Sequence, residues 1–169
     1  MAEPARPKAV IAGIGIRLLG SAYDLCLLFA LCFILFIPVT IAELSLGSIP
    51  HWLKGLLILV IAYAYFVGFW VRGGVTTGMR PWKLRVAMAE SGDSLSLAAA
   101  SIRFAGLMLT WMALGMTFVY MVWKDTGHLL FFIAAGLPAA SLVTMLLTPE
   151  RQTLHDLIAG TGVYRLKQK

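Results

Sequence analysis

The sequence predicts an all-α polytopic membrane protein with four membrane-spanning helices and a short amphipathic helix near its C-terminus. The chain of 169 residues is 60% hydrophobic and only 13% charged, its mean hydropathy is +0.85, and four long runs are nearly free of charge. An ordinary soluble domain has about 25% charged residues, so a soluble fold of this size could not hide so much apolar surface. The same composition excludes a disordered chain.

Four apolar runs mark the membrane-spanning segments, at residues 18–37, 55–71, 104–123 and 129–147, and only the first contains a charge, Asp24. A helix needs about 20 residues to cross about 30 Å of hydrocarbon. Backbone groups in lipid must be hydrogen-bonded within their own segment, so these runs predict helices. We expect the helices at about 17–41, 53–71, 103–124 and 128–148, in a single domain over 1–169.

The first run follows a basic arm, which is the order found in a signal peptide. The run is longer than a usual signal-peptide core, it contains Asp24, and no A-x-A-like cleavage site follows it. We therefore expect an uncleaved helix. Its two cysteines, Cys26 and Cys32, would point about 120° apart on a helix, so we expect no disulfide between them.

The basic residues are distributed unevenly between the two sides of the membrane. Twelve of the 14 Lys and Arg residues lie in the N-terminal arm, the loop from 72 to 103 and the C-terminal tail, whereas Lys54 and Lys124 lie on the other side. Because Lys and Arg in short loops stay in the cytoplasm, we expect both termini there. The net charge of +6 would then face the anionic leaflet. We expect lipid headgroups, and no nucleic acid, as its partner.

The inner loop at 72–102 is the only sizeable segment outside the membrane. Residues 83–88 alternate weakly and predict a short strand, a turn should follow at 90–93, and Ser94 or Ser96 could cap the third helix. We expect the loop to lie on the membrane surface, where four of its residues would contact anionic headgroups. These residues are Arg80, Trp82, Lys83 and Arg85.

The tail at 149–169 predicts a short surface helix. Thr148 is suited to the N-cap, Pro149 to the first helical position, and Gly160 to the helix end. The segment is too short and polar to cross the bilayer, so we expect it to lie along the inner surface with its apolar face in the membrane.

Arg17 and Asp24 are separated by seven residues on the first helix. Seven residues advance about 10 Å and return to nearly the same helix face. A carboxylate at that depth costs a few kcal/mol on insertion scales, so it should face protein or water. The carboxylate could be an ion or proton site, or a structural counter-charge for an arginine. Three further charged or titratable residues would join this inner cluster: Arg103, His155 and Asp156.

The sequence contains no pattern that demands catalysis. The glycines within 73–78 have part of a phosphate-loop spacing but lack the following Lys and Ser or Thr. There is no paired-carboxylate motif and no nucleophile beside a base. The three histidines lie in three segments on both sides of the membrane. We therefore expect no enzyme, metal site or cofactor, although lipid chemistry near His155 and Asp156 is left open.

The sequence resembles the RDD family of bacterial membrane proteins, which is named for one arginine and two aspartates. The matching stretches run from Arg17 to Asp24, from Thr77 to Val86, from Ser96 to Arg103 and from Arg151 to Thr161. By position, Arg17 and Asp24 take the first arginine and aspartate, and Asp156 the second aspartate. Pro81-Trp82 and the long loop between the first two helices depart from the family pattern. The resemblance implies a location in the bacterial inner membrane. A transport role, including sodium–proton exchange, has been proposed for some members.

Two functions are consistent with these residues. In the first, the chain is a small transport or permeation protein in which Asp24 takes and releases a proton or cation. Four helices make a thin bundle for a pore, so we then expect a homo-oligomer. In the second, it is an accessory or scaffold subunit of a larger membrane complex, and its charges are structural. Because an inner arginine needs a carboxylate partner, we expect Arg17 or Arg103 to pair with Asp156 and leave Asp24 as the functional acid.

Overall fold

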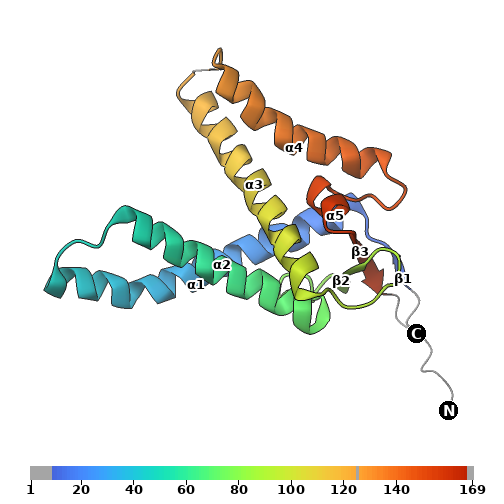
Figure 1. Ribbon diagram of the computed structural model, residues 1–169, viewed down its shortest axis with the longest axis horizontal. Coiled ribbons are helices and arrows are strands. Elements are labelled where there is room, and N and C mark those ends of the chain that lie inside the picture. Colours follow the sequence, from blue (N-terminus) through green and yellow to red (C-terminus); the bar gives the residue numbers. More distant parts are fainter. Residues whose placement is uncertain (1–8, 125, 167–169) are drawn as a thin grey trace.

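The computed structural model describes residues 9–124 and 126–166. Four basic residues of the arm and tail, Arg6, Lys8, Lys167 and Lys169, lie outside this part of the chain, as does Asp125. The fold is mostly helical, as predicted, and Figure 1 shows its four long helices. Their bounds are α1 Ile14–Leu46, α2 His51–Gly73, α3 Leu97–Val122 and α4 Leu129–Leu147.

All four long helices are long and apolar enough to cross a membrane. The structure extends the predicted first helix at both ends, to 33 residues. At 1.5 Å per residue this helix is about 50 Å long, which exceeds the hydrocarbon thickness. The third helix begins at Leu97 because the Ser96 hydroxyl accepts a hydrogen bond from the Ala99 amide at 3.1 Å. The predicted cap at Ser96 is therefore confirmed.

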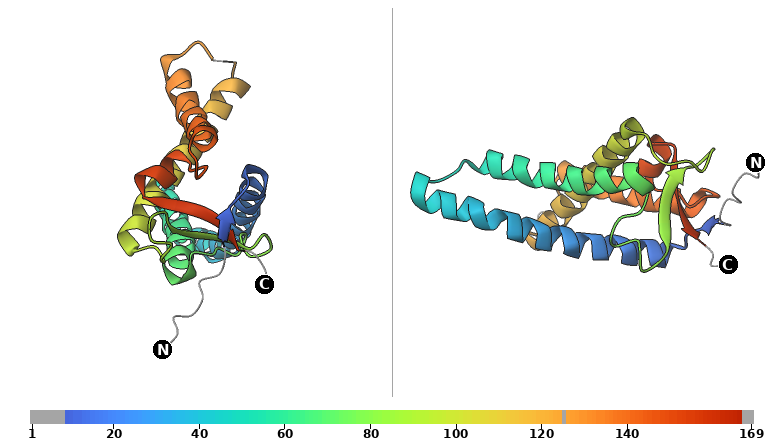
Figure 2. Two further views of the ribbon diagram at one scale, coloured as in Figure 1. Left: turned by 90° about the vertical axis from the view of Figure 1, so that its right-hand side faces the viewer. Right: turned by 90° about the horizontal axis from the view of Figure 1, so that it is seen from below.

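The long helices form two hairpins, α1 with α2 and α3 with α4. The hairpins approach each other at one end and diverge toward the other, as Figures 1 and 2 show. A small β-sheet lies at the end where they meet, which we call the sheet end. At the far end, the Lys54 ammonium contacts a Glu43 carboxylate oxygen at 2.8 Å, and the Ile49 amide donates to the same oxygen at 2.9 Å. These contacts close the α1–α2 hairpin.

The sheet has three antiparallel strands, β1 Ala9–Ile11, β2 Leu84–Met88 and β3 Thr161–Leu166, in the order β1-β3-β2. Val86 is paired with Val163, and Val10 with Arg165. The strand predicted within 83–88 is confirmed, whereas β1 and β3 were not predicted. The inner loop and the tail are therefore joined to each other as one structured cap across the sheet end.

The tail differs from the prediction of a single helix that is capped by Thr148 and begins at Pro149. Thr148 ends α4, and its hydroxyl accepts a hydrogen bond from the Gln152 amide at 2.7 Å. Arg151 adopts a left-handed backbone conformation with φ 52°, which interrupts any helix there. The tail helix, α5, spans only Leu154–Ile158. Gly160 follows it with φ 62°, and the chain then enters β3.

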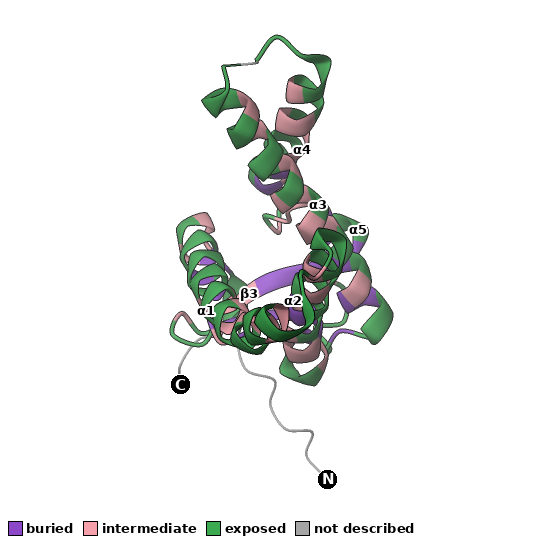
Figure 3. Cartoon of the chain, turned by 90° about the vertical axis from the view of Figure 1, so that its left-hand side faces the viewer, coloured by how far each residue is buried: buried purple, intermediate pink, exposed green. Residues whose placement is uncertain are grey.

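The apolar core lies between the sheet and the adjacent ends of α2 and α3. Trp70, Leu84, Val86 and Ala100 are each at most 1% exposed and belong to it. The backbone of β2 is held against the end of α2, where the Val86 amide donates to the carbonyl of Gly74 at 2.7 Å. Figure 3 shows buried residues gathered in this region, while the far parts of the helices are largely exposed. The buried core of the fold thus lies at the sheet end.

Candidate functional site

Two polar sites lie at the sheet end of the helices. One contains Arg17, Arg103, His155 and Asp156, which we call the inner charge cluster. The other surrounds Asp24 and is described separately, because its partners come from different segments. Four of the five residues expected to form one cluster are therefore brought together, and Asp24 forms a second site.

Asp156 is positioned by the local structure of α5. Thr153 and Asp156 form a capping box, in which the Thr153 amide donates to Asp156 Oδ2 at 3.2 Å. The Thr153 hydroxyl donates to the same oxygen at 2.7 Å. Asp156 is fully buried. The short helix therefore presents one carboxylate in a fixed orientation at the sheet end.

Two arginines from different long helices meet this carboxylate. Arg17 Nη2 lies 2.5 Å from Asp156 Oδ2, and Arg103 Nη1 forms an ion pair with Oδ1. Arg103 Nη1 also donates to the Thr161 hydroxyl at 2.8 Å, at the start of β3. The prediction that Arg17 or Arg103 pairs with Asp156 is confirmed, and both arginines do so. One carboxylate thereby links α1, α3 and α5.

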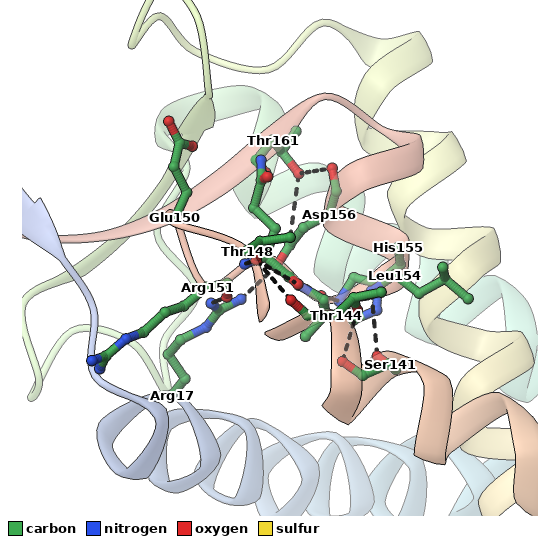
Figure 4. Close-up of polar contacts among 12 residues, drawn as sticks. Arg17, Ser141, Thr144, Thr148, Glu150, Arg151, Leu154, His155, Asp156 and Thr161 are labelled. Atoms are coloured by element: carbon green, nitrogen blue, oxygen red, sulfur yellow. Dashed lines mark hydrogen bonds and ion pairs between the residues drawn. The ribbon is translucent and has the colours of Figure 1, made fainter. Parts of the chain in front are cut away.

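Further contacts fasten the tail beside the cluster, as Figure 4 shows. Arg17 Nη1 donates to the carbonyl of Arg151, and Gln152 Nε2 donates to the carbonyl of Thr161 at 2.8 Å. The amide of Leu154 donates to the Ser141 hydroxyl of α4 at 3.4 Å. The segment between α4 and β3 is therefore tied to both hairpins.

His155 is buried next to the two arginines. Its Nε2 lies 3.0 Å from the Thr153 hydroxyl oxygen. A side chain on Gly106 of α3 would collide with its Cβ, so the close approach of α3 and α5 depends on that glycine. Burial, followed by the charges of Arg103 and Arg17, holds the pKa of His155 well below its usual range. His155 is therefore neutral at pH 7.

Asp24 is 1% exposed and accepts hydrogen bonds from three groups. The Tyr65 hydroxyl donates to Oδ1 at 2.6 Å, the Gly78 amide donates to Oδ1 at 2.8 Å, and the Thr76 hydroxyl donates to Oδ2 at 2.5 Å. A Cβ at Gly78 would lie 2.6 Å from the Asp24 carboxyl carbon. Asp24 therefore connects α1 to α2 and to residues 76–78, which follow α2. All three of its hydrogen-bond donors are uncharged.

The four residues expected at lipid headgroups lie between α2 and β2 or within β2. Arg80 and Lys83 are exposed, and Arg80 lies 5.9 Å from the Phe69 ring centroid. Arg85 is half-buried in β2. Trp82 packs against the core and beside Gly20 of α1, a contact that was not predicted from the sequence. Arg80 and Lys83 are thus the residues available at the surface.

Several residues of the two sites were not identified from the sequence. The Thr76 hydroxyl donates to Asp24, and the hydroxyls of Thr153 and Thr161 donate to Asp156. Thr153 and Thr161 both lie within residues 151–161, one of the stretches that resemble the family. Tyr65 lies inside an apolar run and gives no local signal. In the described ranges 9–124 and 126–166, no three His, Cys, Asp or Glu side chains are grouped as a metal site would require.

The comparisons with known proteins agree with the resemblance. The model of the RDD family matches residues 11–160, which include both aspartates and all of the long helices. Comparison with curated proteins gives no match. Comparison with solved structures gives none either.

Proposed function

The chain belongs to the RDD family, and from this membership and the geometry of Asp24 we propose that it is a small, non-catalytic transport or permeation protein. Asp24 is the proposed ion or proton site. One observation carries the proposal: a buried carboxylate within a membrane helix receives only uncharged donors. No cation contacts Asp24 among the residues that the structure describes.

The two aspartates have opposite electrostatic surroundings. Asp156 is shared by two guanidinium groups, which stabilise its charge. Three hydrogen bonds reduce the cost of burying the Asp24 charge but do not neutralise it. Binding a proton or a small cation would neutralise it, and the hydroxyl oxygens of Tyr65 and Thr76 have lone pairs for a cation. Reversible binding of a proton or small cation is therefore more favourable at Asp24 than at Asp156.

Proton and cation flux in proteoliposomes tests this proposal. Purified protein is reconstituted with an internal pH dye, and a pH gradient is imposed in sodium, lithium or potassium salt. We expect the wild type to dissipate the gradient and Asp24→Asn to slow dissipation at least about tenfold, equivalent to about 1.4 kcal/mol. The control Asp93→Asn removes an exposed acid and should leave the rate unchanged. No flux in the wild type, or equal flux in Asp24→Asn, would contradict the proposal.

A second candidate function is that of an accessory subunit, and the burial of α1 favours it. The buried residues of this helix are Arg17, Gly20 and Asp24, all near its start. Farther along, large side chains such as Phe29 and Phe33 are 73% and 68% exposed. These faces are available to other membrane helices as well as to lipid. Purification at native expression in mild detergent separates the candidates. A homo-oligomer supports transport, and a stoichiometric foreign subunit supports the accessory role.

We also propose that the sheet end faces the cytoplasm of a bacterial inner membrane and that Arg80, Lys83 and Arg85 contact anionic headgroups there. The exposure of Arg80 and Lys83 beside the ends of the long helices supports this placement. Replacing the three residues together by Gln should reduce the phosphatidylglycerol retained during purification. The control Lys124→Gln changes a basic residue at the far end and should retain as much lipid as the wild type.

A further inference from the structure

We propose that the inner charge cluster binds one small monovalent anion of chloride size, held by the Arg103 guanidinium and the Trp70 indole. The proposed site is distinct from Asp24 and goes beyond the transport of a cation or proton. Two independent features of the cluster carry the inference: its charge balance and its unused hydrogen-bond donors.

The charges of the cluster do not balance. Arg17 is 8% exposed and Arg103 is 4% exposed, while the single acid between them, Asp156, is fully buried. The cluster therefore holds two positive charges and one negative charge. An uncompensated buried charge is strongly unfavourable. One bound anion would make the cluster neutral.

His155 does not alter this balance. Burial, followed by the charges of Arg103 and Arg17, holds the pKa of His155 well below its usual range, so the imidazole carries no charge at pH 7. Its Nδ1 is buried and has no hydrogen-bond partner among the described residues. The Thr153 hydroxyl donates its only proton to Asp156, so the neutral imidazole carries its proton on Nε2 and Nδ1 adds no donor to the site.

The donors that would receive the anion are Arg103 Nε and Trp70 Nε1. Both atoms are buried, and neither has a hydrogen-bond acceptor within the part of the chain that the structure describes. The Arg103 guanidinium carbon lies over the Trp70 ring, 4.8 Å from its centroid, so the two side chains that carry these N–H groups are in contact. Arg103 Nη1 is already used by Asp156 and Thr161. A buried N–H group without an acceptor costs about 1–3 kcal/mol, and an anion would satisfy both groups.

The burial of these groups limits the size of the anion. Trp70 is 1% exposed and Thr161 is fully buried. A lipid phosphate carries two bulky substituents that cannot follow it into such an enclosed position, whereas chloride is a sphere that accepts N–H donors from any direction. Chloride or another halide is therefore the class of ligand that fits.

Thermal unfolding in matched salts tests the proposal. Protein in uncharged detergent is unfolded in sodium gluconate with increasing replacement by sodium chloride, at constant ionic strength. We expect chloride to raise the wild-type Tm in a saturable manner, by about 4 °C at ten times its Kd. Trp70→Phe keeps the aromatic ring under Arg103 but removes the N–H donor. Because Trp70 is buried in the core, this variant should have a lower Tm than the wild type in gluconate, and chloride should raise that Tm by at most half of the wild-type shift.

Equal chloride shifts in the wild type and Trp70→Phe would overturn the proposal, and so would the absence of a shift in the wild type. A shift produced by phosphatidylglycerol but not by chloride would also overturn it and identify a lipid phosphate instead. Equilibrium dialysis of the wild type with radioactive chloride gives a readout that needs no variant. We expect one bound chloride per chain, displaced by bromide and not by gluconate, and a failure to bind chloride contradicts the site.

Discussion

Arg17 and Asp156 are 139 positions apart in the sequence, yet Nη2 of the arginine lies 2.5 Å from Oδ2 of the aspartate. Arg17 lies in the first turn of α1, and Asp156 belongs to the short helix α5 that follows the last long helix. Arg103 of α3 binds the other carboxylate oxygen. The hairpins diverge away from the sheet end (Figure 1), and this shared carboxylate links them there together with the packing of α2 on α3, where the rings of Tyr63 and Phe104 meet edge to face.

The shared carboxylate predicts an unequal response to mutation. Asp156→Asn leaves two buried arginines without a counter-charge and should cost about 3–5 kcal/mol of stability. Arg17→Gln leaves Asp156 paired with Arg103 and should cost less. The double variant should be no less stable than Asp156→Asn alone, because its excess of positive charge is smaller. A double-mutant cycle by thermal unfolding in detergent measures the loss of stability in each variant. Strictly additive losses would show that Arg17 and Asp156 are not coupled.

Gly78 predicts a steric test of the Asp24 site. A Cβ at this position would lie 2.6 Å from the Asp24 carboxyl carbon, so Gly78→Ala should displace the carboxylate and destabilise the protein by about 1–3 kcal/mol. Gly73→Ala is the matched control, since nothing lies within 4 Å of a Cβ there. The control should be neutral or slightly stabilising, as alanine favours a helix. Equal Tm values for the two variants would contradict the close packing at Gly78.

His155 predicts a loss of stability in acid. Its folded-state pKa is depressed, mainly by burial, whereas in the unfolded chain it returns to about 6.5. Between these two pKa values the unfolded state binds one more proton than the folded state. The free energy of unfolding is therefore highest above about pH 6.5, and below that pH it falls by up to about 1.4 kcal/mol per pH unit. Unfolding measured from pH 8 to pH 5 should show this slope, and His155→Gln should reduce it.

The control for that experiment is His51→Gln, at the exposed start of α2. It should retain the acid-dependent slope of the wild type. If His155→Gln and the wild type lose stability equally as the pH falls, another group is responsible.

The positive charge around the sheet end predicts its orientation. Reporter fusions after Gly47 and after Lys169 should place the first reporter outside the cytoplasm and the second inside it. A Lys169 reporter found on the outer side would invert the proposed threading. The two positions then serve as controls for each other, because they lie at opposite ends of the helices in the predicted topology.

The helices could be predicted because the physical constraint on each is local. An apolar run in lipid must satisfy its own backbone groups, so hydropathy alone indicates α1 to α4. The pairing of Asp156 was also predictable, because a buried arginine requires a nearby carboxylate. To predict the helices and the pairing of Asp156, it was enough to know which residues are present and roughly how deep in the membrane each one lies.

The sheet and the Asp24 site could not be predicted in the same way. β3 pairs with strands that lie far from it in sequence, and its six residues carry no hydrophobic alternation long enough to separate it from the tail. Tyr65 reaches Asp24 across 41 positions from within an apolar helix. The tail helix begins at Leu154 because Thr148 is used at the end of α4 and Thr153 provides the cap. Each outcome depends on packing between distant segments.

The proposed roles are structural for Asp156 and the uptake of an ion or proton for Asp24. Folded yields of Asp24→Asn and Asp156→Asn, measured by size-exclusion chromatography at equal expression, distinguish these roles. An amide at position 24 still offers an acceptor to Tyr65 and Gly78, so Asp24→Asn should stay within about twofold of the wild type, a change below 1 kcal/mol. Asp156→Asn should lose most of the folded fraction. Normal folding of Asp156→Asn together with collapse of Asp24→Asn would show that the two roles are assigned the wrong way round.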